Sequence, residues 1–285
     1  MSFSNTFINI INHIDSEGQE SQPRDMKVKE SILSSFVIQP TQPIANFKSR
    51  KFNWKYLAGE MCWYLQQDRD VDFIGSFSKF WSKLTNPGTN EINSNYGSLV
   101  FNKEQFGWVI DSLVTDKNSR QAIMFFNQPK FQFKENKDFV CTMYANFFIR
   151  NNKLHMKIQM RSNDIFYGLT FDAPFFSFLQ QSVYLKLKET YKDLELGPYY
   201  HFADNLHFYE RHFDLAESVR NEKISPEEEN TFILKEPLLD YDGKKVFLTK
   251  QGLSYCRDIY DSIGEDRSTL EQDDYKNILA KYFTL

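Results

Sequence analysis

The chain has 285 residues, of which 41% are hydrophobic and 25% charged, as is typical of a soluble globular protein with a substantial core. A formal charge of −4 at pH 7 and a pI near 5.8 argue against a general nucleic-acid-binding protein, which usually carries a basic excess. Three cysteines do not suggest a disulfide framework, and no apolar run is long enough to span a bilayer. We therefore expect a cytoplasmic protein with no membrane and no nucleic-acid partner.

Predicted elements in the first part of the chain alternate with polar segments. A short amphipathic helix precedes a polar loop at residues 15–27, and SILSSFVI after this loop is typical of a strand. Residues 53–67, NWKYLAGEMCWYLQQ, place apolar side chains at helical spacing and predict a helix. Asn, Gly, Ser and Pro are dense in residues 85–98, so we expect a loop there.

The middle of the chain combines strands with one long helix. QAIMFFN and FVCTMYANFFI are typical of strands, and Asn151-Asn152 suits a tight turn into a paired strand, LHMKIQM. Asp172, which precedes Ala-Pro-Phe-Phe, is a favoured helix start, and the segment after it predicts an amphipathic helix that ends near Leu194. Strands followed by such a helix indicate an α/β fold.

Two further signals lie near the C-terminus. Ser225 and Glu228 have the spacing of a capping box at a helix start. Asp242-Gly243 between apolar runs predicts a hairpin turn. Because the chain shows no internal repeat and no flexible linker, we expect a single domain over residues 1–285.

Cys141 stands in an apolar run, where a cysteine is more often a core residue than a nucleophile. Arg161 follows twenty residues later with the predicted turn midway, so pairing of the two strands would bring Cys141 and Arg161 side by side. A guanidinium there would lower the pKa of the thiol and could hold a phosphate through two hydrogen bonds. Ser162 would add a hydroxyl to the same anion site, and Asp164 a carboxylate just beyond it. These residue types favour a reactive thiol beside a phosphate site.

Six stretches, in the same order, resemble thymidylate synthase. They are EMCWYL (60–65), NYG (95–97), NSRQAIM (118–124), the Cys141 segment, RSNDIFYGLTFD (161–172) and LHFYERH (206–212). The resemblance extends over about residues 24–213, whereas residues 214–285 diverge and do not resemble the synthase's folate-closing tail. It implies a thymidylate-synthase-like α/β (α+β) fold, in which helices pack on a mixed sheet, and a homodimer that forms through the sheet face.

The resemblance implies roles for the residues around the thiol. Cys141 falls on the family's nucleophile, Glu60 on its catalytic glutamate and Tyr96 on the tyrosine of its active-site water network. Arg161 and Ser162 fall on the phosphate-binding pair. The implied chemistry is attack of the Cys141 thiolate on a pyrimidine ring.

Other positions match the family's folate and sugar contacts. Asp164 and Gly168 match positions near the pterin of the folate, and Trp81 matches the tryptophan that packs on the folate. His207 and Tyr209 fall on the pair that reads a sugar hydroxyl. The co-substrate implied by the resemblance is 5,10-methylenetetrahydrofolate.

Two more arginines are candidates for binding phosphate. Arg120 falls on an arginine that reaches across the dimer to the partner's phosphate, although Gln121 replaces the second arginine that is usual in the family. Arg24, in QPRDMKVKE, is the candidate for the remaining phosphate arginine. The resemblance thus implies that each site is completed by the neighbouring subunit.

Asp172 stands where thymidylate synthase has an asparagine, eight residues after the position of Asp164. The asparagine suits uracil because it donates to O4 and accepts from N3–H, whereas cytosine offers the inverse pattern. A carboxylate only accepts, so it suits the 4-amino group of cytosine, would stabilise a proton on N3 and would discriminate against uracil. The alternative is that Asp172 is merely the N-cap of the following helix, and the two roles are compatible.

Within the superfamily, this aspartate and the stretches GTNEINSNYG, FVCTM and MRSNDIFYG are similar to the phage deoxycytidylate hydroxymethylases. That similarity implies transfer of a one-carbon unit to C5 of dCMP and addition of water, in the cytoplasm of an infected host cell. A dCMP C5-methylase, a CMP or dUMP hydroxymethylase and a catalytically silent nucleotide-binding homologue stay open as alternatives. The five histidines lack metal-ligand spacing with Cys or acidic partners, so no metal is expected.

Overall fold

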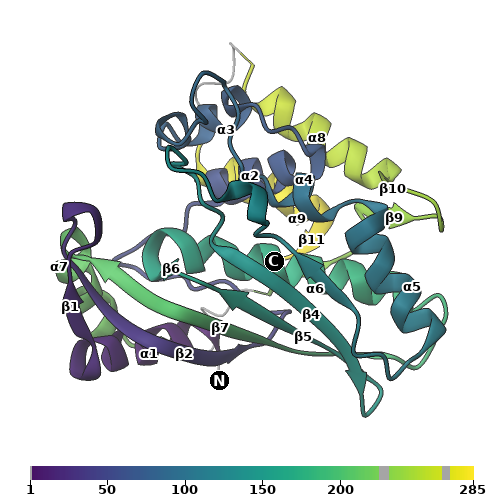
Figure 1. Ribbon diagram of the computed structural model, residues 1–285, viewed down its shortest axis with the longest axis horizontal. Coiled ribbons are helices and arrows are strands. Elements are labelled where there is room, and N and C mark those ends of the chain that lie inside the picture. The colour runs from purple at the N-terminus through teal and green to yellow at the C-terminus, as the bar shows by residue number, and fades with distance from the viewer. Residues whose placement is uncertain (1, 225–230, 265–269) are drawn as a thin grey trace.

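The computed structural model describes residues 2–224, 231–264 and 270–285, and it contains a mixed sheet with helices packed against it (Figure 1). The helices are α1 (Phe3–Glu17), α2 (Trp54–Gln66), α3 (Val71–Phe77), α4 (Tyr96–Val100), α5 (Trp108–Thr115), α6 (Thr170–Leu187), α7 (Phe213–Arg220), α8 (Lys250–Ser262) and α9 (Gln272–Tyr282). The strands are β1 (Gln19–Ser21), β2 (Val28–Ile38), β3 (Ile123–Phe125), β4 (Thr142–Arg150), β5 (Lys153–Met160), β6 (Asn163–Asp164), β7 (Glu195–Tyr209), β8 (Ile233–Leu234), β9 (Leu239–Tyr241), β10 (Val246–Leu248) and β11 (Phe283–Thr284).

Strand β7 lies inside the main sheet, whose order is β1-β2-β7-β5-β4-β3. It pairs antiparallel with β2 and parallel with β5, and β6 continues the parallel pairing beyond the end of β5. The pairing of β6 sets Asn163 opposite Leu206 and Asp164 opposite His207. The sheet therefore brings β2, β5, β6 and the C-terminal end of β7 to one place.

The predicted hairpin of β4 and β5 is confirmed. Asn151 and Asn152 adopt left-handed backbone angles, with φ of 50° and 59°, which asparagine tolerates better than most residues. The antiparallel register runs from Arg150 opposite Lys153 to Thr142 opposite Met160. One residue beyond, the backbone N–H of Arg161 donates to the carbonyl of Cys141 over 2.9 Å. The hairpin thus aligns the two ends that carry the predicted site.

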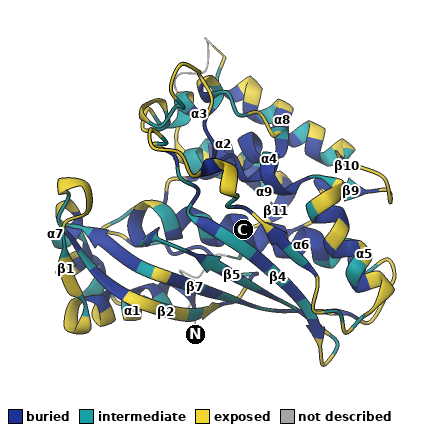
Figure 2. Ribbon diagram, viewed as in Figure 1, coloured by how far each residue is buried: buried dark blue, intermediate teal, exposed yellow. Residues whose placement is uncertain are grey.

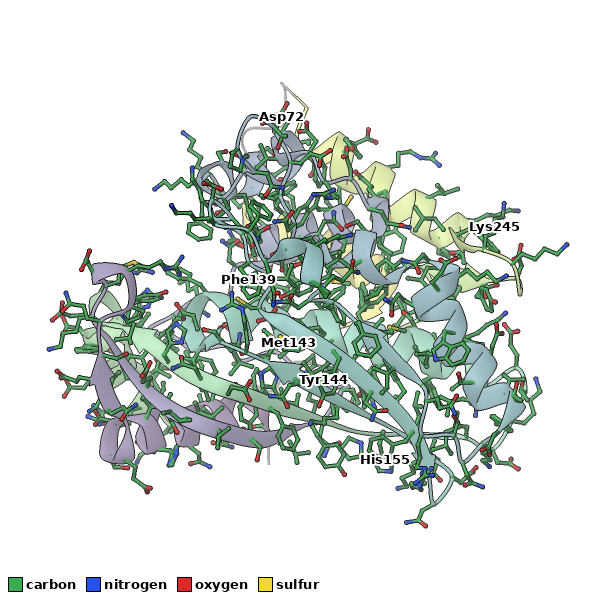
Figure 3. The ribbon with its side chains drawn as sticks, viewed as in Figure 1. Asp72, Phe139, Met143, Tyr144, His155 and Lys245 are labelled. Atoms are coloured by element: carbon green, nitrogen blue, oxygen red, sulfur yellow. The ribbon has the colours of Figure 1, made fainter. Side chains whose placement is uncertain are left out.

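The two faces of the sheet differ in burial, as the alternating colours along β4, β5 and β7 show (Figure 2). Ala145, Phe147 and Ile149 on β4 are buried, as are their counterparts on β5. Side chains at the alternate positions are only half-buried, among them Tyr144 on β4 and His155 on β5, which Figure 3 labels. Period-two alternation of this kind is typical of a sheet with one face on the core.

Helix α6 corrects two sequence predictions. It begins at Thr170, directly after a π-helical turn over Ile165–Leu169, so Asp172 lies in its first turn and is not the N-cap. The carboxylate instead accepts a hydrogen bond from Asn163. The helix ends at Leu187 and not near Leu194, and it is buried on almost all sides, so the expected amphipathic pattern is wrong. A helix enclosed between the sheet and other helices needs no polar face.

Smaller predictions had mixed outcomes. Asp242-Gly243 does turn between β9 and β10, with a φ of 87° at Gly243. The polar segment 15–27 is not all loop, because it includes the short strand β1, which pairs with β2. The predicted capping box at Ser225 and Glu228 lies outside the described residues. In the part of the chain that is described, no helix is long and apolar enough to cross a membrane.

The C-terminal segment with α8 and α9 packs against α2, the helix that carries Glu60. From α8, the Tyr255 hydroxyl donates to the carbonyl of Ala58 over 2.8 Å. Cys62 on α2 and Cys256 on α8 are both buried and free, as expected of core thiols, and Cys62 Sγ lies 3.9 Å from the Cys256 carbonyl oxygen. α9 completes this cover of α2 (Figure 1).

We propose that the whole chain, residues 1–285, is one cooperative domain in which α8 and α9 fold with α2. Tyr255→Phe removes a fully buried hydrogen bond, so it should lower the free energy of unfolding by about 1–3 kcal/mol within a single urea transition. Tyr260→Phe is the matched control: its hydroxyl also reaches α2, at Gln66, but the side chain is exposed and the loss should stay below about 0.5 kcal/mol. Two separate transitions would contradict the single domain.

Candidate active site

Cys141 lies directly before β4, beside Arg161 at the end of β5. The Nη2 atom of Arg161 is 3.4 Å from Cys141 Sγ, so the predicted neighbours are side by side. The guanidinium also donates to the carbonyl oxygens of Phe139 and, over 3.2 Å, Val140, and it lies 4.7 Å from the centre of the Phe139 ring. Figure 3 labels Phe139 at this junction between the sheet and the helices. The arginine is therefore fixed in place before any ligand binds.

The pKa of the Cys141 thiol corrects the expectation of a lowered value. Burial raises this pKa above its ordinary value, and the charges of Arg161 and Arg24 oppose the rise without reversing it. Asp172 and Asp138 add to the rise. The resting group is therefore the neutral thiol, and attack on a substrate requires that its proton be given up.

Tyr96 is tied to the residue next to Cys141. Asn95 caps α4, and its side-chain amide holds the carbonyls of Trp63 and Asp68, which fixes the start of the helix. The Thr142 hydroxyl donates to the Tyr96 hydroxyl over 2.9 Å. Burial raises the pKa of Tyr96, with further contributions from Asp172 and Cys141. The phenol is therefore a neutral group among the candidate residues.

Glu60 is buried on α2 and belongs to a hydrogen-bond chain that the sequence did not reveal. The Trp81 indole N–H donates to the Tyr56 hydroxyl over 3.0 Å, and this hydroxyl donates to Glu60 Oε1 over 2.8 Å. Burial raises the pKa of Glu60 to about 8, although the bond from Tyr56 opposes the rise. Near neutral pH this carboxyl group can hold a proton or release it. Trp81, expected near the folate, is thus connected to the expected catalytic glutamate.

Asp172 faces the same group of acids from the first turn of α6. Burial raises its pKa to about 6, and the hydrogen bond from Asn163 Nδ2 to Oδ2, 2.7 Å long, opposes this shift. A Cβ atom at Gly168 would lie 2.7 Å from Asn163 Nδ2 and 3.3 Å from Asp172 Oδ2, so the pair requires a residue without a side chain there. Asn163 stood in the RSND stretch without an assigned role.

Asp164 has one engaged and one free carboxylate oxygen. Oδ1 accepts from the backbone N–H groups of Phe166, over 2.7 Å, and Tyr167, over 3.1 Å. Oδ2 is buried and has no hydrogen-bond partner among the described residues. A buried acceptor without a partner is costly unless a ligand donates to it, so this oxygen fits the N–H groups of a pterin.

The candidate sugar and phosphate residues lie around this carboxylate. His207 is opposite Asp164 in the sheet, and its ring centre is 5.3 Å from that of Tyr209 in an edge-on arrangement. Burial lowers the pKa of His207, and Arg24, which is exposed and has a left-handed φ of 53°, lowers it further. Ser162 is half-buried in the connection between Arg161 and β6.

Arg50 is a site residue that the sequence analysis missed. Its Nη2 atom donates to the carbonyl of Phe166, and its charge faces Asp164. Burial lowers its pKa to about 10, so it remains a cation at neutral pH. The basic run KSRK before α2 was a signal for a charge in this region, but not for its position.

Arg120 is the candidate that the structure does not bring to the others. It is exposed in the segment between α5 and β3, and it makes no hydrogen bond or ion pair with the other candidates in the described part of the chain. Among the described residues, no group of three or more His, Cys, Asp or Glu could hold a metal ion. Besides a thiol, carboxyl groups, phenols and arginines, the candidate site of a single chain includes Trp81, Ser162 and His207.

Comparisons with known proteins relate the chain to one family. The family model described as thymidylate synthase matches residues 5–241. Deoxycytidylate 5-hydroxymethyltransferase of Enterobacteria phage T2 is 29% identical over 229 residues, which are 77% of this chain and 87% of that protein. Deoxyuridylate hydroxymethyltransferase of Bacillus phage SP01 is 28% identical over 221 residues, covering 71% and 56%. Thymidylate synthase of Mycoplasma genitalium is 22% identical over 244 residues, covering 73% and 82%.

The two phage relatives are named for different bases, cytosine in one and uracil in the other, although the chain is almost equally identical to both. Identity to these relatives therefore does not distinguish the two bases, whereas the residues of the site bear on the choice. The family itself, expected from the six sequence stretches, is confirmed by a match that covers most of the chain. The chain belongs to the thymidylate synthase family, whose members are one-carbon transferases with methylenetetrahydrofolate as co-substrate.

Proposed function

We propose that the protein is a deoxycytidylate 5-hydroxymethyltransferase, which transfers a one-carbon unit from 5,10-methylenetetrahydrofolate to C5 of dCMP and adds water. The observation that carries this proposal is the carboxylate of Asp172, which Asn163 holds among the acids around Cys141. The similarity to phage deoxycytidylate hydroxymethyltransferases supports it. The phage relatives also support action in the cytoplasm of an infected host cell.

Base recognition follows from the acceptor-only character of a carboxylate. With a pKa of about 6, Asp172 is mostly ionised at neutral pH and accepts from the 4-amino group of cytosine and from a proton on N3. Uracil would place its O4 acceptor against the carboxylate oxygens of Asp172. Two buried acceptors that face each other without a donor disfavour binding. Asn163 already donates to Oδ2, which leaves Oδ1 for the base.

The reaction starts with addition of the Cys141 sulfur to C6 of the ring. As the thiol gives up its proton and the S–C6 bond forms, N3 gains a proton and C5 becomes nucleophilic. Asp172 stabilises the positive charge that spreads over N3 and C4. C5 then attacks the one-carbon unit, and loss of the C5 proton to Glu60, whose pKa is about 8, accompanies departure of tetrahydrofolate and leaves an exocyclic methylene on the ring. Water adds to this methylene as the S–C6 bond breaks, and the proton that the water gives up balances the one that the Cys141 sulfur takes back.

Two groups of side chains position the substrates. Methylenetetrahydrofolate supplies the electrophilic one-carbon unit, and Trp81, Asp164 and Gly168 are the residues that we assign to its binding. The free Oδ2 atom of Asp164 would accept from the pterin. Arg24, Arg161 and Ser162 bind the phosphate, and His207 and Tyr209 address the sugar hydroxyl.

We also propose a homodimer that forms through the half-buried face of the sheet. Tyr144 and Phe148 on β4 offer aromatic surface on this face. On β2, which β7 and β5 separate from β4, Ile32 and Leu33 are 58% and 78% exposed. A cavity of about 580 Å³ lies next to them, between α1 and β2, and none of the candidate residues lines it. The partner would supply Arg120 to the phosphate.

The base preference tests the proposal most directly. Incubation with dCMP and methylenetetrahydrofolate should add a hydroxymethyl group by mass analysis, and dUMP should react at least about tenfold more slowly in kcat/KM. Asp172→Asn restores one donor and one acceptor, so it should lose dCMP activity and gain turnover of dUMP. A wild-type preference for dUMP would contradict the assignment and favour the activity named for the Bacillus phage relative. A methyl product would indicate a methylase, and no reaction a silent homologue.

Replacement of the nucleophile gives the second prediction. Cys141→Ser should abolish turnover but leave dCMP affinity within about threefold, because the phosphate and base contacts lie on other residues. Cys256→Ser, at a buried thiol outside the site, is the control and should retain wild-type turnover if the protein folds. More than about one hundredth of the wild-type rate in Cys141→Ser would remove Cys141 from this role.

Subunit mixing tests the dimer and Arg120 together. Arg120→Ala and Cys141→Ala should each be inactive, but their mixture should recover about a quarter of wild-type activity after subunit exchange. Each mixed dimer then holds one site with an intact Cys141 facing an intact Arg120. As a control, Arg120→Ala mixed with the double variant Arg120→Ala/Cys141→Ala should recover nothing. A monomer by sedimentation, or no recovery after proven exchange, would overturn this arrangement.

A further inference from the structure

A buried chain of hydrogen bonds leads from Asp172 into the sheet. Asn163 Oδ1 lies 3.0 Å from His201 Nε2, and the other ring nitrogen, Nδ1, is hydrogen-bonded to the Tyr199 hydroxyl. His201 and Tyr199 are fully buried on β7, and Asn163 is 3% exposed. Burial of such polar groups costs free energy unless each forms a hydrogen bond. Here each of them bonds to another residue of this network.

When Asp172 is ionised, only one assignment of donors and acceptors fits this series of hydrogen bonds. A carboxylate accepts, so the NH₂ group of Asn163 must face it and the amide oxygen must face His201. His201 then carries its proton on Nε2, and the lone pair on Nδ1 accepts from the hydroxyl of Tyr199. If the Asn163 amide were reversed, its oxygen would face the carboxylate of Asp172. Two acceptors would then meet without a proton between them, which is unfavourable.

His201 is suited to this fixed role because it stays neutral. Burial lowers its pKa to about 3, and its ring stacks on Phe36 of β2 at a centre-to-centre distance of 4.9 Å and an angle of 16°. The stack limits rotation of the ring, and β2 and β7 pair with Phe36 opposite His201. The histidine can therefore act as a rigid donor at Nε2 over the whole neutral range of pH.

Nothing else around Asp172 supplies this hydrogen bond in the described part of the chain. The titratable groups whose charges interact with it are all acids. They are Tyr56, Glu60 and Tyr64 on α2, Tyr96 on α4, Cys141 before β4, Asp164 on β6 and Tyr199 on β7. The side-chain hydrogen bond of Asn163 is the one contribution that lowers the pKa of Asp172.

We propose that His201 and Tyr199 are positioning residues, which fix the orientation of the Asn163 amide and so keep Asp172 an acceptor for the base. This inference rests on the proposed reading of cytosine by Asp172. It extends the determinants of base selectivity from the substrate pocket to two side chains in the core of the sheet. Tyr199 acts through His201, and His201 through Asn163.

Three variants separate positioning from packing. His201→Phe keeps an aromatic ring on Phe36 but removes the donor to Asn163, and it should reduce the ratio of kcat/KM for dCMP to that for dUMP by about ten- to a hundredfold. His201→Gln can donate to Asn163 and accept from Tyr199, so it should keep the ratio within about threefold of wild type. Tyr199→Phe should reduce the ratio as His201→Phe does, but less. Tyr191→Phe, which removes a half-buried hydroxyl that donates to the carbonyl of Leu113 outside the site, is the control and should leave the ratio unchanged.

A measurement without substrate tests the chain of hydrogen bonds independently. In protein labelled with ¹⁵N-histidine, the His201 ring, assigned by its loss in His201→Gln, should be neutral with its proton on Nε2 from pH 6.5 to 8. In Tyr199→Phe this single tautomer should give way to a mixture. A proton on Nδ1 or a charged ring in the wild type would overturn the inference, as would an unchanged substrate ratio in a folded His201→Phe. An Nε2–H tautomer in a wild-type enzyme that prefers dUMP would overturn the proposed base and leave the positioning intact.

Discussion

The parallel pairing of β7 with β5 and β6 is the constraint on which the site depends. Arg161 directly follows β5, and Asn163 and Asp164 make up β6, a strand of only two residues. The antiparallel pairing of β7 with β2 brings the segment with Arg24 to the same end. Strand register is set by the alternation of buried side chains, so a shift by one residue would turn each of these groups to the other face. The site is therefore as well defined as the core beneath it.

Desolvation is the second theme of the site. Burial raises the pKa of Glu60 to about 8 and that of Asp172 to about 6, and it raises the pKa of the Cys141 thiol as well. When acidic groups lie close together and are shielded from water, fewer of them are ionised at a given pH than in solution. Glu60 and Asp172 can therefore gain or lose a proton near neutral pH, which suits the successive proton transfers of the proposed reaction.

The sequence predicted the parts of the site that depend on local signals. The Asn151-Asn152 turn, together with the apolar alternation on both sides of it, was sufficient to place Arg161 beside Cys141. The N-cap at Asp172 was wrong because a π-helical turn starts the helix earlier, and such turns leave no clear pattern in a sequence. The expected fall of the thiol pKa was wrong because spacing shows a nearby cation but not the extent of burial.

Contacts between distant segments were beyond reach of the sequence. His201 stood on β7 as one polar residue in a strand-like stretch, and nothing nearby in the chain indicated that it would meet Asn163. The same holds for Arg50, which donates to a carbonyl in the π-helical turn more than a hundred residues further along the chain. Family resemblance helped only at positions that match the family's own motifs, so these two residues had no precedent to suggest them.

The cover of α2 by α8 and α9 has a consequence for the entropy of binding. Glu60 belongs to a helix whose outer side is packed by Tyr255 and its neighbours, and its own side chain is held by Tyr56. A side chain that has already lost its rotamer freedom on folding does not lose it again when a substrate arrives, which would suit the proposed role of Glu60 in proton transfer. α8 and α9, which lie outside the part of the chain that the family model matches, thus help to keep the Glu60 side chain in place.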